Sequence, residues 1–352
     1  MLNKKEYFPA LTGVRAIAAL LVYFHHYNPF KDKQFLYGIF NEFHIGVTIF
    51  FVLSGFLITY RYINLKKSDY KIYFVRRFAR IYPTYFILTT LLLFKTFFVN
   101  ENWNYNFKIY LLNITFLKGY FSDYFQSMIA AGWSLTVEET FYILAPVLFF
   151  FIKKNKYYLI ILPFILINIG LLSVEIFSQR ISFGFMSSHA FLFNYTFFGR
   201  CAEFFIGIYL AIFIRKNTKL IPNATYIGII IIVLSCYLLS IVKGNKPFGI
   251  NTTDGKIINN IILPFLGIMP FLYGLIKEKT FLSKILSTKL FEILGKTSFA
   301  FYLIHQTGVI RPIIISVINY FQISYPLIEY VFILLLLQIF SYLIYNYIEK
   351  NF

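Results

Sequence analysis

Ten residues separate two polar side chains, Arg15 and His26, in the otherwise apolar stretch LTGVRAIAALLVYFHHYN, so the two are eleven positions apart. Histidine suits general acid–base chemistry, because it changes charge near neutral pH. At 3.6 residues per turn this separation is close to three full turns, so the guanidinium and the imidazole share one helix face about 16 Å apart. A charged side chain at the centre of a membrane helix costs about 2.5–3.5 kcal/mol on insertion scales, so such residues mark functional sites. The spacing predicts one membrane helix that presents both groups to a pocket.

Three other histidines are weaker candidates for chemistry. His25 is one position, or about 100 degrees, from His26 on the helix and is predicted to face elsewhere. His44 falls in the next segment, and His189 falls in a predicted outer loop. No two histidines show metal-ligand spacing with a carboxylate on one face, so the sequence predicts no metal site.

A cluster of arginines precedes an apolar run in FVRRFARIYPTYF. Arg76 and Arg80 are four positions apart and share a helix face, with Arg77 alongside. Guanidinium groups arranged in this way suit bidentate binding of phosphate. Anchoring at the cytoplasmic surface of the membrane would also explain any one of them. We expect a phosphate site, with anchoring as the alternative.

Two carboxylates, Glu138 and Glu139, enter an apolar run in GWSLTVEETFYILAPVLF. Carboxylates are stabilised near a helix N-terminus by its dipole, so a solvated cap is one interpretation. The apolar sequence after Tyr142 and the preceding Trp133 instead indicate that at least one carboxylate faces the interior of the helix bundle.

In three further motifs a structural role competes with a functional one. Ser54 and the glycine after it interrupt FFVLSGFLITYR, where small residues suit a close helix contact or a tightly packed pocket wall. Arg200 and Glu203 are three positions apart and can form a structural ion pair across one helical turn. Tyr302 and His305 share a helix face, where a histidine that packs between helices is the simpler interpretation of His305.

The composition places these residues in a membrane protein. The 352 residues are 59% hydrophobic, 22% aromatic and only 14% charged, whereas soluble domains are about a quarter charged. The net charge of +18 does not indicate nucleic-acid binding, because the basic residues flank apolar runs and form no continuous patch. The sequence therefore predicts an all-α, polytopic integral membrane bundle with no nucleic-acid partner.

Apolar windows of about 17–25 residues predict the membrane spans. No internal repeat or linker divides the chain, so residues 1–352 are predicted to form a single integral membrane domain. The ten predicted spans are 10–28, 45–62, 82–99, 133–152, 157–174, 198–214, 224–242, 258–276, 297–319 and 326–347.

Lysines and arginines between the spans predict the orientation. One set of alternate loops and termini carries 21 of them, and the opposite set carries eight. Basic residues are enriched on the cytoplasmic side, so both termini are predicted to be cytoplasmic. The segment 100–132 is the longest outer connection and is expected to carry an interfacial helix.

Taken together, six motifs resemble the acyltransferase-3 family of membrane-bound O-acyltransferases, which modify bacterial surface polysaccharides. The family pattern implies that Arg15 and His26 are its spaced arginine and catalytic histidine, and that Glu138 is the first carboxylate of its acidic motif. Many relatives carry a further soluble esterase-like domain, so this chain resembles the short, stand-alone form that acylates sugars, most often with acetyl. The motifs, in order, are LTGVRAIAALLVYFHH, FFVLSGFLIT, RRFARIYP, GWSLTVEETFY, RCAEFFIG and TSFAFYLIH.

The resemblance implies transfer of an acetyl group from acetyl-CoA, a donor substrate and not a permanently bound cofactor, to a polysaccharide or lipid-linked sugar. His26 would act as general base and Glu138 would orient it, while Arg76, Arg77 and Arg80 would meet the phosphates of CoA at the cytoplasmic side. The expected location is the inner (cytoplasmic) membrane, with membrane lipids around the bundle.

Two other classes of function are compatible with a polytopic chain. A polysaccharide or lipid-linked sugar exporter would need intramembrane polar groups, but it should also show repeated halves with broken helices. A purely structural subunit would explain the packing motifs but not the pairing of Arg15 with His26. The acceptor sugar, its hydroxyl position, acetyl against succinyl, direct transfer against an acyl-histidine intermediate, and the oligomeric state all stay open.

Overall fold

Helices make up the regular structure of the chain in the computed structural model, which describes residues 7–30, 32–99, 103–216, 220–308, 310–320 and 326–351. Across these ranges the β-structure is limited to one isolated bridge between Phe121 and Phe185. The predicted all-α class is confirmed.

The first helix, α1 (Pro9–His26), runs without interruption through both Arg15 and His26. It begins at a proline, whose fixed φ suits the first turn and whose missing N–H is not needed there. His25 and His26 lie in its last turn, where an imidazolium interacts favourably with the negative end of the helix dipole. The helix predicted to carry Arg15 and His26 is therefore present.

Seven helical segments within the described ranges are long and apolar enough to cross a membrane. Each contains or largely overlaps one of the ten predicted spans. The seven segments are Gln34–Tyr62, Ala130–Lys154, Tyr158–Phe177, His189–Arg215, Ala224–Val242, Thr253–Lys277 and Ile328–Tyr347.

The other three predicted spans do not fall in these seven segments. The span 10–28 corresponds to α1, whose 18 residues include an arginine and two histidines, and 82–99 is the second part of the 30-residue helix α4 (Tyr70–Val99). The span 297–319 is divided between α14 (Lys289–Ile304) and α15 (Ile310–Tyr320). Gly308 precedes α15 and Pro312 lies in its first turn, and both residue types disfavour an unbroken helix. A continuous ninth span is thus corrected to two helices, and the count of ten is not confirmed.

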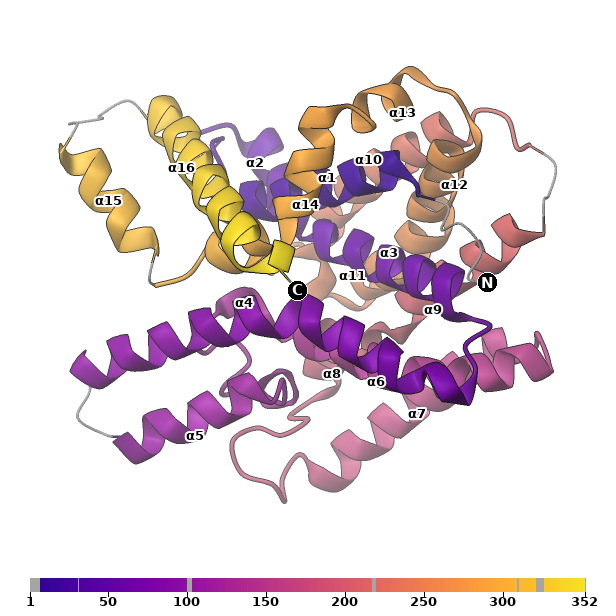
Figure 1. Cartoon of the computed structure of the whole chain (residues 1–352), viewed down its shortest axis with the longest axis horizontal. Helices are drawn as coiled ribbons and strands as arrows, with labels where there is room; N and C mark the ends of the chain where they lie inside the picture. The colour runs from indigo at the N-terminus through magenta and orange to yellow at the C-terminus, as the bar shows by residue number, and fades with distance from the viewer. Residues whose placement is uncertain are drawn as a thin grey trace. The chain divides into compact units, whose positions relative to one another are not determined.

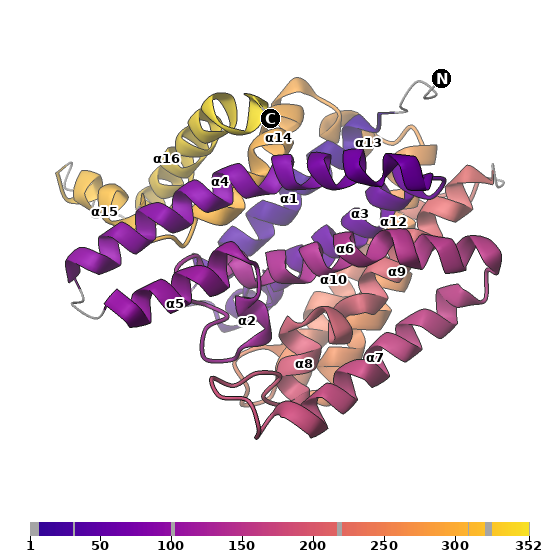
Figure 2. The same ribbon diagram turned by 60° about the horizontal axis from the view of Figure 1, so that its bottom comes forward.

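The predicted orientation stays a prediction. Three of the lysines that support it, Lys4, Lys5 and Lys219, lie outside the described residues. In the segment 100–132 a helix, α5 (Trp103–Ile114), is present as expected, followed by the short turns η3 (Lys118–Tyr120) and η4 (Ala130–Gly132). Helix α5 runs alongside the second part of α4 (Figure 1; Figure 2).

The backbone contacts divide the chain into two compact units, each assembled from three separate stretches of sequence. The first unit comprises residues 1–66, 144–168 and 198–296, and the second comprises 67–143, 169–197 and 297–352. Both units include parts of α6 (Trp133–Lys154), α7 (Tyr158–Phe177) and α14. The prediction of one integral domain is not tested by this division.

In the first unit, α1 packs along the third helix of the chain, α3 (Figure 1). Val14 and Ala18 of α1 and Val52 and Phe56 of α3 are part of a buried apolar core. The elements of this unit besides α1 are α2 (Gln34–Asn41), η1 (Glu42–His44), α3 (Ile45–Tyr62), α9 (Phe197–Arg215), α10 (Ala224–Val242), η5 (Gly249–Asn251), α11 (Thr253–Ile257), the π-helix η6 (Ile258–Ile268), α12 (Met269–Lys277) and α13 (Phe281–Leu286).

In the second unit, buried aromatic side chains connect α4 with α6. Tyr73 and Phe141 are buried, and the Tyr73 hydroxyl donates a hydrogen bond of 2.9 Å to the carbonyl oxygen of Tyr142. The elements of this unit not yet given are η2 (Lys67–Asp69), α8 (His189–Tyr195), α16 (Pro326–Tyr347) and η7 (Glu349–Asn351).

Candidate active site

The end of α1 carries the predicted catalytic base. His26 is exposed in the last turn of the helix, while Arg15 is half-buried near its middle. An exposed imidazole at a helix end is accessible to a substrate hydroxyl, which a general base requires. The roles of Arg15 and His26 stay predictions.

His26 belongs to a group of three histidine rings contributed by α1 and η1. The ring centroids of His25 and His26 are 4.5 Å apart, and those of His25 and His44 are 5.5 Å apart with perpendicular planes. The ring of Phe248 packs on the same group, 4.9 Å from His25 and 5.9 Å from His44. Sequence reasoning separated these histidines because it considered the face of one helix at a time, whereas the contact between His25 and His44 is tertiary.

A buried carboxylate, which sequence reasoning missed, lies next to this group. Glu42 in η1 is 0% exposed, and its Oε2 atom lies 3.1 Å from Nε2 of His44. Both of its oxygens also accept a hydrogen bond of 3.0 Å from the backbone N–H of Gly249. The only local signal was the two-residue spacing of Glu42 and His44; the glycine is far away in the sequence.

The predicted ion pair between Arg200 and Glu203 is present in α9. The shortest of three hydrogen bonds between them joins Nη2 of Arg200 to Oε1 of Glu203 at 2.7 Å, and both side chains are buried. Nη2 of Arg200 also donates to the Thr48 hydroxyl at 3.0 Å, and its guanidinium lies 5.2 Å from the centroid of the Phe51 ring. Burial is compensated by these contacts, as a structural ion pair between α9 and α3 requires.

The small residues after Phe51 are at a close helix contact. A Cβ atom on Gly55 would lie 2.2 Å from the carbonyl oxygen of Phe204 in α9. Ser54 is half-buried beside it. The helix-contact interpretation of this motif therefore holds for the glycine, and a role of Ser54 in a pocket wall stays a prediction.

The three arginines of α4 differ in their surroundings. Arg76 is exposed and Arg80 is half-buried, whereas Arg77 is 8% exposed. Arg77 and Glu139 lie within electrostatic range of each other, which indicates that Arg77 faces the interior of the second unit. The structure thus leaves Arg76 and Arg80 as the accessible members of the predicted phosphate site.

Glu138 and Glu139 are both half-buried near the start of α6. Glu138 accepts a hydrogen bond of 3.4 Å from the Tyr142 hydroxyl. The Oε1 atom of Glu139 is buried and has no hydrogen-bond partner in the described structure. Burial of that oxygen supports the interpretation that at least one carboxylate faces inward and does not form a solvated cap. His26 belongs to the first unit and Glu138 to the second, so their pairing stays a prediction.

Tyr302 and His305 make packing contacts within the second unit. The hydroxyl of Tyr302 lies 2.8 Å from that of Ser134 at the start of α6, and it donates to the carbonyl oxygen of Ala131 at 3.3 Å. Nδ1 of the buried His305 donates to the carbonyl oxygen of Tyr302 at 2.7 Å. This geometry fits the interpretation of His305 as a residue that packs between elements.

A buried lysine orders the chain before α6 and was not predicted. Lys118 is 0% exposed, and its Nζ atom donates to the carbonyl oxygens of Ser127 at 2.7 Å and Ile129 at 2.6 Å. Burial lowers the pKa of Lys118 to about 7, because the charged form is poorly solvated there. The sequence around Lys118, ITFLKGYF, does not show which carbonyl groups would surround its ammonium group.

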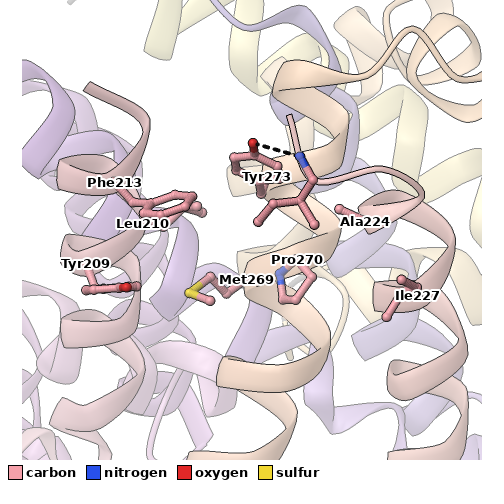
Figure 3. Close-up of a pocket in the computed structure, with 9 residues that line it drawn as sticks. Tyr209, Leu210, Phe213, Ala224, Ile227, Met269, Pro270 and Tyr273 are labelled. Atoms are coloured by element: carbon pink, nitrogen blue, oxygen red, sulfur yellow. Dashed lines mark hydrogen bonds between the residues drawn. The ribbon is translucent and has the colours of Figure 1, made fainter. Parts of the chain in front are cut away.

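An apolar cavity of about 310 Å³ lies in the first unit, between α9, α10 and α12 (Figure 3). Among the lining residues, the Ile221 N–H donates a hydrogen bond of 3.3 Å to the Tyr273 hydroxyl. None of the predicted site residues lines this cavity, and its surface suits an apolar group. The lining residues are Tyr209, Leu210, Phe213, Ile221, Ala224, Ile227, Met269, Pro270 and Tyr273.

In the part of the chain that the structure describes, no three His, Cys, Asp or Glu side chains are arranged to hold a metal ion.

Comparison with known proteins gives one family and a set of named relatives. A family model described as an acyltransferase domain matches residues 8–346. The chain is similar to O-acetyltransferase OatA of Staphylococcus aureus strain NCTC 8325, with 28% identity over 375 residues, which cover 98% of this chain and 57% of the relative. The OatA protein of strain COL matches to the same extent. The chain thus spans 57% of the length of these relatives, and no solved structure matches it significantly.

Proposed function

Since the chain belongs to the acyltransferase-3 family, we propose that it is a membrane-bound O-acyltransferase that moves an acetyl, or related short acyl, group to a sugar hydroxyl. The acceptor is a cell-envelope or exported polysaccharide, or a lipid-linked sugar. The similarity of nearly the whole chain to proteins named O-acetyltransferase carries this proposal.

The proposed reaction uses His26 as its general base. Nε2 or Nδ1 of the imidazole takes the proton of the sugar hydroxyl as the oxygen attacks the thioester carbonyl of acetyl-CoA. The C–O bond forms, the C–S bond breaks, and the imidazolium returns its proton to the thiolate of CoA. The products are the acetylated sugar and free CoA. Transfer through an acetyl-histidine is the two-step variant of this reaction.

The donor is proposed to bind at Arg76 and Arg80 on the cytoplasmic side. Their exposed and half-buried guanidinium groups lie one helical turn apart on α4 and suit the phosphates of CoA. Arg77 supports this part of α4 from the interior through Glu139. Arg15 and Glu138 are proposed to orient the reacting groups, and the chain is proposed to reside in the inner membrane.

Transfer of radiolabelled acetyl groups from acetyl-CoA to polysaccharide in isolated membranes tests the proposal. His26→Ala should lower the rate by about 10²–10⁴-fold, the usual cost of losing a positioned base. His189→Ala is the matched control, because His189 is exposed and pairs with Glu175 at 3.1 Å within the second unit. Transfer by His26→Ala membranes at the rate of the control, with equal amounts of protein, would refute the role of His26. An unaltered protein that transfers no acetyl group would refute the proposed function.

A further inference from the structure

Glu42 is a buried carboxylate that the proposed mechanism does not use. It is 0% exposed, although an isolated carboxylate is strongly disfavoured in a protein interior. Its two oxygens accept from the Gly249 N–H, and one also contacts Nε2 of His44. The Gly249 N–H can only donate, so both oxygens of Glu42 accept from it. Glu42 therefore places a buried carboxylate in the first unit beside a histidine.

Hydrogen bonding fixes the orientation of His25 between Glu42 and His26. Nδ1 of His25 lies 2.6 Å from the carbonyl oxygen of Asn41, which can only accept, so Nδ1 carries the proton. In the neutral ring this leaves Nε2 of His25 as the atom that can accept a proton. The imidazole of His25 is thus held in one tautomer and one orientation.

The rings make an unbroken series from the carboxylate to the predicted base. Glu42 contacts His44, the His44 ring packs edge-on to His25, and the His25 ring packs edge-on to His26. Phe248 packs against His25 and His44, and both histidines are half-buried. Charges interact more strongly in partly buried surroundings than in bulk water.

We propose that Glu42 is a positioning residue for the base His26, acting through His44 and His25. Its negative charge stabilises the positive charge that appears on the histidine group when His26 takes the proton of the acceptor. This inference rests on the proposed function. The proton itself follows the route given above, from the sugar hydroxyl to His26 and then to the thiolate of CoA.

Several titratable and hydrogen-bonding groups surround these histidines and influence the pH dependence of the proposed base. From α1 come His25 and His26, from η1 come Glu42 and His44, and from α10 the Cys236 thiol lies within electrostatic range of Glu42. The short helix η5 contributes the backbone N–H of Gly249, and α2 contributes the carbonyl oxygen of Asn41. Arg200, which donates to Thr48 of α3, is paired with Glu203.

The test is the pH profile of kcat/KM for acetyl transfer by the purified full-length protein, with Glu42→Gln as the variant. The acidic limb of this profile reports the pKa of the general base in the free enzyme. Removing the negative charge makes the imidazolium less stable, so the limb should move to lower pH by about one unit, while KM for acetyl-CoA stays nearly unchanged. Glu42→Asp keeps the charge and should restore the limb of the unaltered protein.

Glu278→Gln is the matched control, because Glu278 also accepts backbone N–H groups, from Ala224 and Thr225, but contacts no histidine in the described structure. The acidic limb of the pH profile of Glu278→Gln should coincide with that of the unaltered protein. If Glu42→Gln fails to fold, His44→Gln replaces it as the test variant. The glutamine amide at position 44 can still donate to Glu42, but the imidazole that links Glu42 to His25 is gone. A limb that moves to lower pH in that variant supports the proposal.

The inference is overturned if the acidic limb is unchanged in a folded Glu42→Gln variant. If His44→Gln is used in its place, an unchanged acidic limb overturns the inference in the same way. The proposed function fails on a different result, namely no acetyl transfer by the unaltered protein. The two failures are therefore distinguishable in the same assay.

Discussion

Replacing Gly55 by alanine tests the contact between α3 and α9. The added Cβ atom would lie 2.2 Å from the carbonyl oxygen of Phe204, which is backbone and cannot rotate away. An ordinary contact is about 3.5 Å, so the two helices would have to separate by more than about 1 Å. The contact is reciprocal, because a Cβ atom on Gly207 of α9 would lie 2.2 Å from the carbonyl oxygen of Val52 in α3.

The expected cost follows from overpacking. Extra methyl groups in a well-packed interior cost about 1–3 kcal/mol, and separation of the helices would also stretch the 3.0 Å hydrogen bond from Arg200 to Thr48. The gain in helix propensity from glycine to alanine, about 1 kcal/mol, offsets part of this cost. Gly55→Ala should therefore lower the free energy of unfolding by about 1–3 kcal/mol.

Thermal unfolding of the detergent-solubilised protein, followed by intrinsic fluorescence, measures the effect. Gly38→Ala in α2 is the matched control, because its Cβ atom would make an ordinary contact of 3.7 Å with Ser240. Gly55→Ala should melt several degrees below the unaltered protein. Gly38→Ala should melt at the same temperature as the unaltered protein or slightly above it, because it gains helix propensity without a clash. If both variants melt together with the unaltered protein, α3 and α9 do not pack as closely as described.

Two other changes have defined outcomes. Replacing Arg76 and Arg80 together by glutamine should raise KM for acetyl-CoA at least about tenfold and change KM for the acceptor much less, since charge-assisted bonds to phosphate are the strong ones; equal donor dependence in the variant and the unaltered protein would reduce these arginines to membrane anchors. Because burial lowers the pKa of Lys118 from 10.5 to about 7, the unfolded chain holds more protons than the native protein between these values, and stability should rise with pH across that interval. Lys118→Met should flatten this rise in the melting temperature between neutral and alkaline pH, and a slope identical to that of the unaltered protein would contradict the burial of the charge.

Local spacing in the sequence was sufficient for features that one helix contains. The apolar runs predicted the helical class, and the motif order predicted the family that the comparison confirms. The pairing of Arg200 with Glu203 could be predicted because residues three apart on a helix are neighbours whatever the rest of the fold does. The helix through Arg15 and His26 follows from the same rule.

The division of the predicted ninth span into α14 and α15 was less accessible. The sequence is apolar on both sides of the break. A sliding hydropathy window averages over Gly308, which precedes α15, and Pro312, which lies in its first turn. The different exposures of Arg76 and Arg77 also depend on which side of α4 is covered. Helical periodicity gives the relative directions of two side chains but not which direction faces the interior.

The surroundings of the predicted base were decided by tertiary structure alone. The contact of His25 with His44 joins α1 to η1, and the N–H that helps to hold Glu42 comes from Gly249, 207 positions along the chain. The burial of Lys118 likewise depends on the carbonyl groups of Ser127 and Ile129 that surround its ammonium group. Each of these arrangements needs chain segments whose approach is set by the packing of apolar helix faces, and that packing carries no fixed spacing in the sequence.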